Sequence, residues 1–207
     1  MYSPLVRTLL AVAFLTPSVV LAAVPQDPAH VTPLTVGTTV PTVTVRSPDG
    51  TDRSLGPRSL TKPTILIFYR GGWCPYCNAH LGELRKAEPA LIDLGYDLLF
   101  LSADRPQLLY SSLKDPDLKY TILSDARMTA ARAYGVAFRV DDATVARYKE
   151  FGIDLEVASG ETHHELPVPA VFIVDRNGVI RFVHANADYK VRLAPDVLLA
   201  EARRVAR

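Results

Sequence analysis

Both cysteines of this chain lie in one short motif, Cys74-Pro75-Tyr76-Cys77. The motif follows an apolar run over residues 64–69 and precedes leucines and alanines at helical spacing, so it sits where a buried strand passes into a helix. A helix N-terminus presents unpaired N–H groups and the positive end of the helix dipole, and both favour a thiolate over a thiol. Because the thiolate is the reactive form of cysteine, the position predicts a redox-active pair.

The spacing of the two cysteines predicts a different role for each. Side chains at positions i and i+3 share one face of a helix, so the two sulfurs can meet. Cys74 is nearer the helix start, and we expect it to be the more exposed, attacking thiolate. Cys77 is then the buried thiol that resolves the intermediate. Pro75 fits the first helical turn, where its missing N–H costs nothing.

Three other uses of a cysteine pair are disfavoured. A structural disulfide across so short a loop would constrain the unfolded chain by only about 2 kcal/mol. Zinc needs two further ligands, and His80, His163 and His164 offer no second close pair. Covalent haem attachment needs a histidine directly after the second cysteine, where this chain has Asn78. The sequence therefore predicts redox chemistry, with no metal and no cofactor.

A second motif, Val168-Pro169, immediately precedes an apolar run over residues 170–174. A proline that simply opens a strand is sterically allowed. Its position also suits a cis peptide bond held against the cysteines, and such bonds are rare and usually serve a purpose. We predict that cis bond, with the Val168 backbone pairing to an extended substrate beside Cys74.

Strand and helix signals alternate along the rest of the chain. Strands are predicted over residues 42–45, 64–69, 96–102, 120–123, 170–175 and 179–183. Helices are predicted over residues 81–94, 106–114, 127–134, 141–151 and 195–207, and a polar loop over residues 152–167. Turn residues at 47–50 and 176–178 predict two hairpins. This order predicts an α/β thioredoxin-like sandwich, a mixed central β-sheet with helices on both faces.

Composition excludes several classes of protein. Hydrophobic residues make up 48% and charged residues 22%, which excludes collagen-like and wholly disordered chains. The net charge is +1, and the 23 basic residues are scattered, so we expect no nucleic-acid partner. Two cysteines cannot form a disulfide-dense scaffold.

The N-terminus reads as a targeting segment. Residues 1–22 contain one charge, Arg7, then apolar stretches and small residues that suit a cleavage site after Ala22. An uncleaved anchor remains open, although residues 16–18 interrupt the apolar run. We expect a signal peptide (1–22), a proline-rich N-terminal arm (23–41) and a thioredoxin-like domain (42–207). The protein is then exported, to the periplasm, with no stable membrane association after cleavage.

Segments along most of the chain resemble the AhpC/TSA, peroxiredoxin-like, family of the thioredoxin superfamily. The matching segments are FYRGGWCPYC, DLLFLSAD, SDARMTAARAYGV and PAVFIVDRNGVIRFV. The resemblance spans roughly residues 36–204. It implies thiol-dependent reduction of hydroperoxides or of disulfides, with regeneration by a thioredoxin-type donor.

The chain also departs from that family's pattern. Typical members carry Thr or Ser three residues before the attacking cysteine and proline seven before, where this chain has Gly71 and Ile67. They also carry an arginine ahead of the late strand, where this chain has Val168-Pro169. The resemblance implies that those groups orient the peroxide oxygens. Arg70 could substitute for them, or it could be a solvated charge at a strand end.

Two enzymatic functions follow. The first is an antioxidant peroxidase that reduces hydroperoxides through a Cys74/Cys77 disulfide recycled by a thioredoxin-type donor. The alternative is a disulfide reductase that exchanges with protein disulfides at Cys74. A metal-binding or chaperone-like module is a third, non-enzymatic reading. The substrate-positioning candidates are Arg70, Trp73, Pro75, Tyr76, Val168 and Pro169.

Several side chains have a structural reading beside a functional one. Trp73 and Tyr76 could form an apolar rim for a docking partner or could simply pack the loop. His80, on the helix after the cysteines, could tune a thiol or shuttle a proton, but we expect an ordinary half-exposed histidine. His163 and His164 are expected to be solvated.

Overall fold

The computed structural model describes residues 23–109 and 119–206. The predicted signal peptide and residues 110–114 of the predicted helix over 106–114 lie outside these ranges. Among the helices in these ranges, none combines the length and the apolar character needed to cross a membrane.

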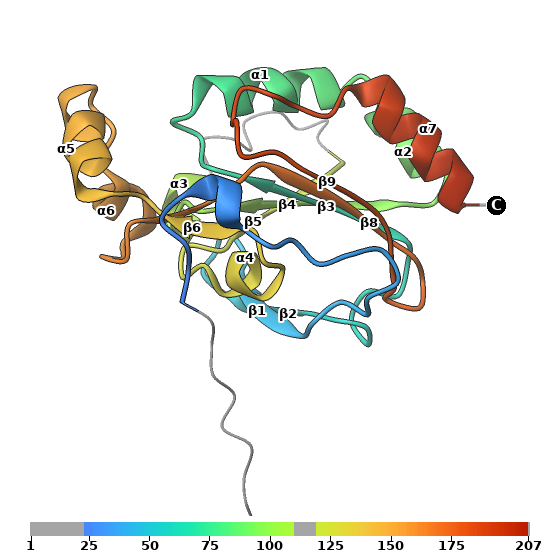
Figure 1. Ribbon diagram of the computed structural model, residues 1–207. Coiled ribbons are helices and arrows are strands. Elements are labelled where there is room, and N and C mark those ends of the chain that lie inside the picture. Colours follow the sequence, from blue (N-terminus) through green and yellow to red (C-terminus); the bar gives the residue numbers. More distant parts are fainter. Residues whose placement is uncertain (1–22, 110–118, 207) are drawn as a thin grey trace, which may run out of the picture.

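A seven-stranded mixed sheet forms the centre of the fold, in the order β2-β1-β5-β4-β3-β8-β9 (Figure 1). Its strands are β1 (Val43–Arg46), β2 (Asp52–Leu55), β3 (Thr64–Tyr69), β4 (Asp97–Ser102), β5 (Thr121–Ser124), β8 (Ala170–Val174) and β9 (Ile180–Ala185). β4 pairs in parallel with β3 and β5, and the other neighbours are antiparallel. Both predicted hairpins are present, as β1–β2 and β8–β9.

Helices cover both faces of the sheet, as predicted. They are α1 (Pro75–Leu84), α2 (Glu88–Asp93), α3 (Pro106–Leu109), α4 (Thr129–Ala133), α5 (Asp142–Glu150), α6 (Leu155–Ser159) and α7 (Pro195–Val205), with a short 3-10 turn, η1 (Pro28–His30). Figure 1 shows α1, α2 and α7 over one face and α4 on the other. β3 is buried throughout: Leu66 and Phe68 enter one core, Ile65 and Ile67 the other. A central strand apolar on both faces explains this double core.

The continuous helix expected over residues 81–94 is wrong. Two helices stand there: α1 ends at Leu84, and α2 begins at Glu88. Pro89 lies in the first turn of α2, and proline has no N–H to continue the hydrogen bonding of a preceding helix. The break follows from this residue.

The polar loop expected over residues 152–167 is also wrong. It contains α6, whose N-terminal amides at Glu156 and Val157 donate to the Asp154 carboxylate. It also contains β7 (Glu165–Pro167), which pairs with β6 (Ala137–Arg139) in a separate two-stranded sheet. Three-residue strands carry too little periodicity to be recognised without their partner.

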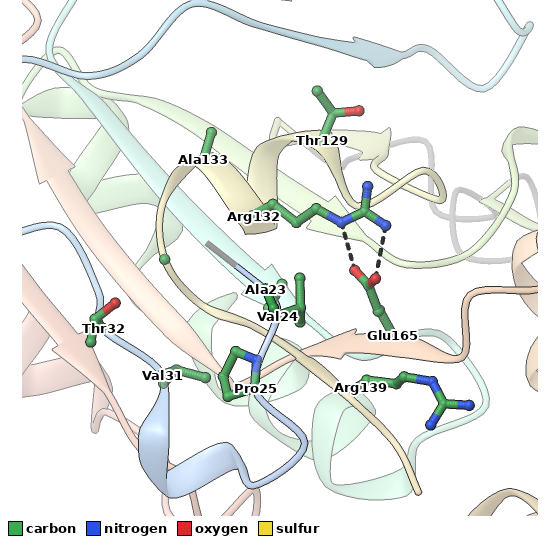
Figure 2. Close-up of a pocket in the computed structure, with 12 residues that line it drawn as sticks. Ala23, Val24, Pro25, Val31, Thr32, Thr129, Arg132, Ala133, Arg139 and Glu165 are labelled. Carbon is green, nitrogen blue, oxygen red and sulfur yellow. Dashed lines mark hydrogen bonds and ion pairs between the residues drawn. The ribbon is translucent and has the colours of Figure 1, made fainter. Parts of the chain in front are cut away.

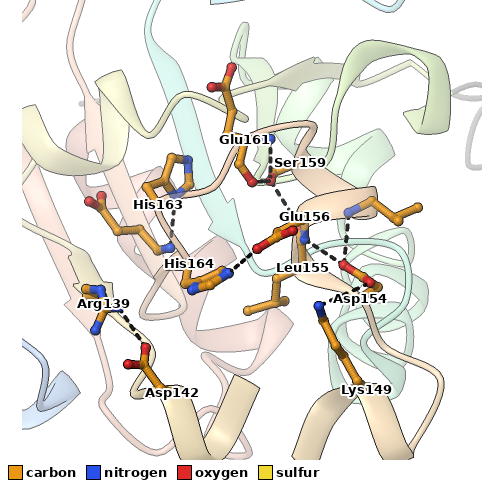
Figure 3. A network of polar contacts seen from close by, with 12 residues as sticks. Arg139, Asp142, Lys149, Asp154, Leu155, Glu156, Ser159, Glu161, His163 and His164 are labelled. Carbon is orange, nitrogen blue, oxygen red and sulfur yellow. Dashed lines mark hydrogen bonds and ion pairs between the residues drawn. The ribbon is translucent and has the colours of Figure 1, made fainter. Parts of the chain in front are cut away.

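Polar contacts fix the α5–α6 lobe, which projects beside the sheet (Figures 1 and 3). The joined pairs are Arg139–Asp142 at 2.7 Å, Lys149–Asp154 at 3.6 Å and His164–Glu156 at 2.7 Å. His163 is half-buried, with Nε2 2.8 Å from the Ala126 carbonyl oxygen. The expectation that both histidines are solvated is therefore wrong, because each is tied to a neighbouring segment.

The arm over residues 23–41 runs along the sheet edge. The Gly37 amide donates to the Ile180 carbonyl and the Val40 amide to the Gly178 carbonyl, each at 2.8 Å. These bonds fasten the arm to the start of β9.

Candidate active site

The two cysteines lie where β3 passes into α1, as predicted. Cys74 precedes the first residue of α1, and Pro75 takes the first helical position. Both thiols are free, and the residues are only 2% and 1% exposed. Both cysteine side chains are thus buried, with Cys74 the slightly more exposed of the two, as expected. The two cysteines differ in their access to a substrate, because Cys74 lines a cavity and Cys77 does not line it.

The loop between β3 and Cys74 is held by the carboxyl end of β4. Gly71 has a φ of +144°, and a Cβ there would lie 2.7 Å from Asp104 Oδ1. The Gly72 amide donates to Asp104 Oδ2 at 2.6 Å. Burial raises the pKa of Asp104, and the Gly72 bond opposes that rise. Glycine at position 71 lets the chain pass this close to Asp104 and the Trp73 ring.

Arg70 is buried, which excludes a solvated strand-end charge. Its guanidinium carbon lies 4.4, 5.2 and 5.5 Å from the ring centroids of Tyr189, Trp73 and Tyr148. Nη2 donates to the Tyr148 hydroxyl. Within residues 23–109 and 119–206 the guanidinium forms no ion pair with a carboxylate, and Nε is buried without a hydrogen-bond partner. Such a cation can still bind a polar oxygen.

A cavity of about 390 Å³ opens beside these groups. Its wall comprises Arg70, Trp73, Cys74, Pro75, Tyr76, Thr144, Arg147, Tyr148, Phe151, Ile153 and Tyr189. Tyr76 is 43% exposed and stacks edge-on against Tyr189, while Trp73 is half-buried, with its ring centroid 6.2 Å from that of Tyr148. The sequence did not predict that α5 contributes to this wall, because none of its residues belongs to a motif with recognisable chemistry.

Arg192 is a site residue that the sequence did not reveal. It lies between β9 and α7, and its Nη2 donates to Cys77 Sγ at 3.3 Å. The hydrogen bond from the Cys74 thiol and the positive charge of Arg192 lower the pKa of Cys77 to about 6. The same thiol–thiolate contact, together with burial, raises the pKa of Cys74. These contacts favour the thiolate at Cys77, where the sequence predicted it on Cys74.

The cis peptide bond predicted at Val168-Pro169 is wrong. No peptide bond among the described residues is cis. The Val168 amide donates to the Val136 carbonyl at 2.9 Å, so this amide is not free to pair with a substrate strand. Both residues line a second cavity of about 200 Å³, whose wall shares Arg70, Tyr148 and Tyr189 with the cavity beside Cys74. The amide bond follows directly on the β6–β7 pairing, which the sequence did not predict.

His80 is buried, not half-exposed. Its Nε2 donates to the Leu193 carbonyl at 3.0 Å, and burial lowers its pKa. The contact joins α1 to the segment that carries Arg192.

A larger cavity, of about 700 Å³, lies elsewhere in the described chain (Figure 2). It borders the arm at Val24 and Pro25 and holds the paired side chains of Arg132 and Glu165. Neither cysteine lines it, so its size does not make it the redox site.

A sequence model of the AhpC/TSA family matches residues 36–183. The chain belongs to the AhpC/TSA family. It is 25% identical over 150 residues to the chloroplastic peroxiredoxin Q of Suaeda salsa, covering 72% of this chain and 59% of that one. A probable thiol:disulfide interchange protein of Pasteurella multocida, DsbE-2, is 28% identical over 136 residues, covering 61% of this chain and 69% of that protein.

Solved structures show the same fold for this AhpC/TSA protein. Peroxidoxin BcpB of Mycobacterium tuberculosis superposes with a TM-score of 0.61 at 20% identity, covering 83% of this chain and 98% of that one. Reduced Prx3 of Vibrio vulnificus gives a TM-score of 0.64 at 16% identity, covering 82% and 99%. The expected thioredoxin-like fold and family resemblance are both confirmed.

Proposed function

We propose that this AhpC/TSA protein reduces hydroperoxides with the Cys74–Cys77 dithiol. One observation carries the proposal: Cys74 lines a cavity whose wall also holds a buried arginine, Arg70, with no carboxylate partner in the described chain. A thiol and a guanidinium without a carboxylate partner on one wall suit a substrate that offers an electrophilic oxygen and releases an anionic one. The peroxiredoxin relative supports the same class of substrate.

Arg70 is proposed to polarise the peroxide. Its N–H groups can donate to both peroxide oxygens, and its charge stabilises the oxygen that leaves when the O–O bond breaks. Its three aromatic neighbours and the Tyr148 hydroxyl hold the guanidinium in place before substrate arrives. Arg70 thus orients the peroxide oxygens, a task that falls to Thr or Ser and to Pro in typical family members and that Gly71 and Ile67 cannot perform.

The proposed reaction has two chemical steps and a recycling step. The Cys74 sulfur attacks one peroxide oxygen, the O–O bond breaks, and the alcohol or water product leaves with a proton, so that Cys74 becomes a sulfenic acid. Cys77 attacks the Cys74 sulfur, an S–S bond forms, and water leaves. A thioredoxin-type dithiol then reduces the disulfide by exchange. The sum converts one hydroperoxide and two thiols into an alcohol, water and a disulfide.

Thiol–disulfide exchange with a protein substrate is the second candidate. The relative named as a thiol:disulfide interchange protein favours it. The hydrogen bond between the Val168 amide and Val136 weighs against it, because it occupies the backbone expected to bind an extended substrate. We therefore place peroxide reduction first.

Stopped-flow fluorescence tests the choice. Trp73 is the only tryptophan and neighbours Cys74, so its emission reports disulfide formation. We expect reduced protein to react with stoichiometric hydrogen peroxide orders of magnitude faster than a free dithiol does. A rate near that of the free dithiol would overturn the peroxidase proposal and favour exchange. Cys74→Ser should remove the fast phase, while Cys77→Ser should allow one turnover and then stop.

We also infer that the protein is exported, with residues 1–22 removed. The charge and apolar pattern of that segment supports this. Expression of the full chain with mass measurement of the product tests it: a chain that begins at Ala23 or Val24 is expected, and a full-length product would contradict it.

A further inference from the structure

Arg192 reaches a cysteine sulfur from a distant part of the chain. It lies in the segment between β9 and α7, and its Nη2 is 3.3 Å from Cys77 Sγ. That segment is fixed one residue later, where the Leu193 carbonyl accepts from His80 Nε2 at 3.0 Å. Because His80 follows Cys77 by less than one turn of α1, two adjacent points of the segment meet the same helix face. The guanidinium is thus held over Cys77.

His80 suits this task because it is neutral. Burial lowers its pKa, so at neutral pH the ring carries one proton, and a contact with a carbonyl oxygen puts that proton on Nε2. The histidine therefore adds no charge that would compete with Arg192 for the sulfur.

The groups that face Cys77 favour an anion at that sulfur. They are Cys74, Tyr69 at the end of β3, the Arg70 amide and Arg192. His80 and His184 lie beside Arg192. Burial lowers the pKa of His184, and burial raises the pKa of Tyr69, so both are neutral at pH 7. None of these groups is a carboxylate, and Glu83 acts on His80. The Arg192 cation is therefore the charge in contact with the sulfur.

From this geometry we infer that Arg192, positioned by His80, stabilises the thiolate of Cys77 in the reduced enzyme, so that Cys77 is ready to act as the resolving nucleophile. The second half of this statement rests on the proposed peroxidase function. The first half concerns the thiols alone. Arg192 and His80 are positioning residues, since the geometry places them against Cys77 and its segment and not on the cavity wall.

The steps balance. Cys74 loses its thiol proton as its sulfur attacks the peroxide. The O–O bond breaks, and the departing alkoxide or hydroxide takes up that proton. The Cys77 thiolate then faces the Cys74 sulfenic acid. Its attack forms the disulfide and releases hydroxide, which takes a proton from solvent.

Single-cysteine variants test the location of the charge. The thiolate absorbs near 240 nm, so a pH titration of Cys74→Ser reports Cys77 and that of Cys77→Ser reports Cys74. We expect the Cys77 midpoint to lie at least one pH unit below that of Cys74, since an opposite charge at this range shifts a pKa by about 1–3 units. A Cys77 midpoint equal to or above that of Cys74 would overturn the inference.

Arg192 is then tested in the Cys74→Ser background. Arg192→Gln should raise the Cys77 midpoint by about one unit or more, and Arg192→Lys should recover part of the shift. Lys190→Gln is the matched control, because its amine contacts the Tyr189 ring and no sulfur contact is recorded for it. An unchanged midpoint in folded Arg192→Gln would refute the role of Arg192. If that variant does not fold, Arg192→Lys and His80→Asn are compared with Lys190→Gln in its place. Both should raise the Cys77 midpoint above that of the control, and no rise in either refutes the role of Arg192.

These titrations use no peroxide. A slow reaction with peroxide together with the expected order of midpoints would refute the peroxidase function and support the role of Arg192 at Cys77. A fast reaction with the opposite order of midpoints would refute only the role of Arg192.

Discussion

The Gly72 amide donates to Asp104 Oδ2 at 2.6 Å and so ties the loop before the cysteines to the end of the neighbouring parallel strand. Ser102 adds a second bond to the same carboxylate at 3.1 Å. The loops that follow β3 and β4 are thereby held together. The position of Cys74 depends on a residue 30 positions later in the chain, which explains why backbone changes in this loop should affect both stability and reactivity.

Gly71→Ala should lower stability by about 2 kcal/mol, because a φ of +144° strains an L-residue and the new Cβ would meet Asp104 and Trp73. Thermal or urea unfolding measures this. Gly82→Ala is the matched control: Gly82 lies inside α1 with nothing within 4 Å of a new Cβ, so it should stabilise by up to about 1 kcal/mol. Equal effects of the two substitutions would contradict the role given to Gly71.

Arg70→Gln should slow the reaction of Cys74 with peroxide by about 100-fold, as the loss of one preorganised donor to a developing oxyanion does elsewhere. Tyr148→Phe keeps the ring and removes the hydroxyl that Arg70 contacts, so we expect a smaller loss, about tenfold. Stopped-flow rates measure both. Alkylation of the thiols by iodoacetamide is the control reaction, since it releases no oxyanion. If alkylation slows as much as peroxide reduction, Arg70 acts on the thiols and not on the peroxide.

The cavity beside Cys74, about 390 Å³, is far larger than hydrogen peroxide requires. The protein should therefore accept a bulky hydroperoxide such as cumene hydroperoxide. Ile153→Trp would fill part of the wall and should reduce kcat/KM for the bulky substrate by at least about tenfold, while the value for hydrogen peroxide changes by about threefold or less. Parallel losses for both substrates would show that the bulky one does not use this cavity.

Asp125 should make stability depend on pH. Burial raises its pKa to about 7, although it accepts hydrogen bonds from the Ala130 and Ala131 amides. Since the unfolded value is about 3.9, the folded protein holds the proton more tightly, and the resulting stabilisation is full below about pH 4 and lost as the pH rises to about 7.

The matching experiment compares the wild type with Asp125→Asn, which cannot titrate at this position. Urea unfolding at pH 5, 6, 7 and 8 should show the wild type losing stability relative to the variant by up to about 1.4 kcal/mol per pH unit between pH 5 and 7. A constant difference across this range would show that Asp125 does not titrate there.

The sequence by itself determined the chemistry and the main architecture. Both cysteines share one motif at a strand–helix junction, and the apolar run of β3 specifies a strand buried on both faces, so the redox pair, the mixed sheet and the family resemblance all followed from local pattern. Pro75 was placed correctly for the same reason, because its restricted backbone suits one position of a helix.

Only the tertiary structure decided how the pair is charged and what surrounds it. Arg192, Asp104 and Tyr148 reach the motif from segments 30 to 115 positions away, and no local spacing encodes such meetings. The same limit explains what the sequence missed. The Val168 amide bonds to Val136 next to a strand pairing too short to recognise, and a contact with Arg192 favours the thiolate at Cys77, where the helix dipole predicted it on Cys74. A full cation in contact with a sulfur outweighs the partial charge of a helix end.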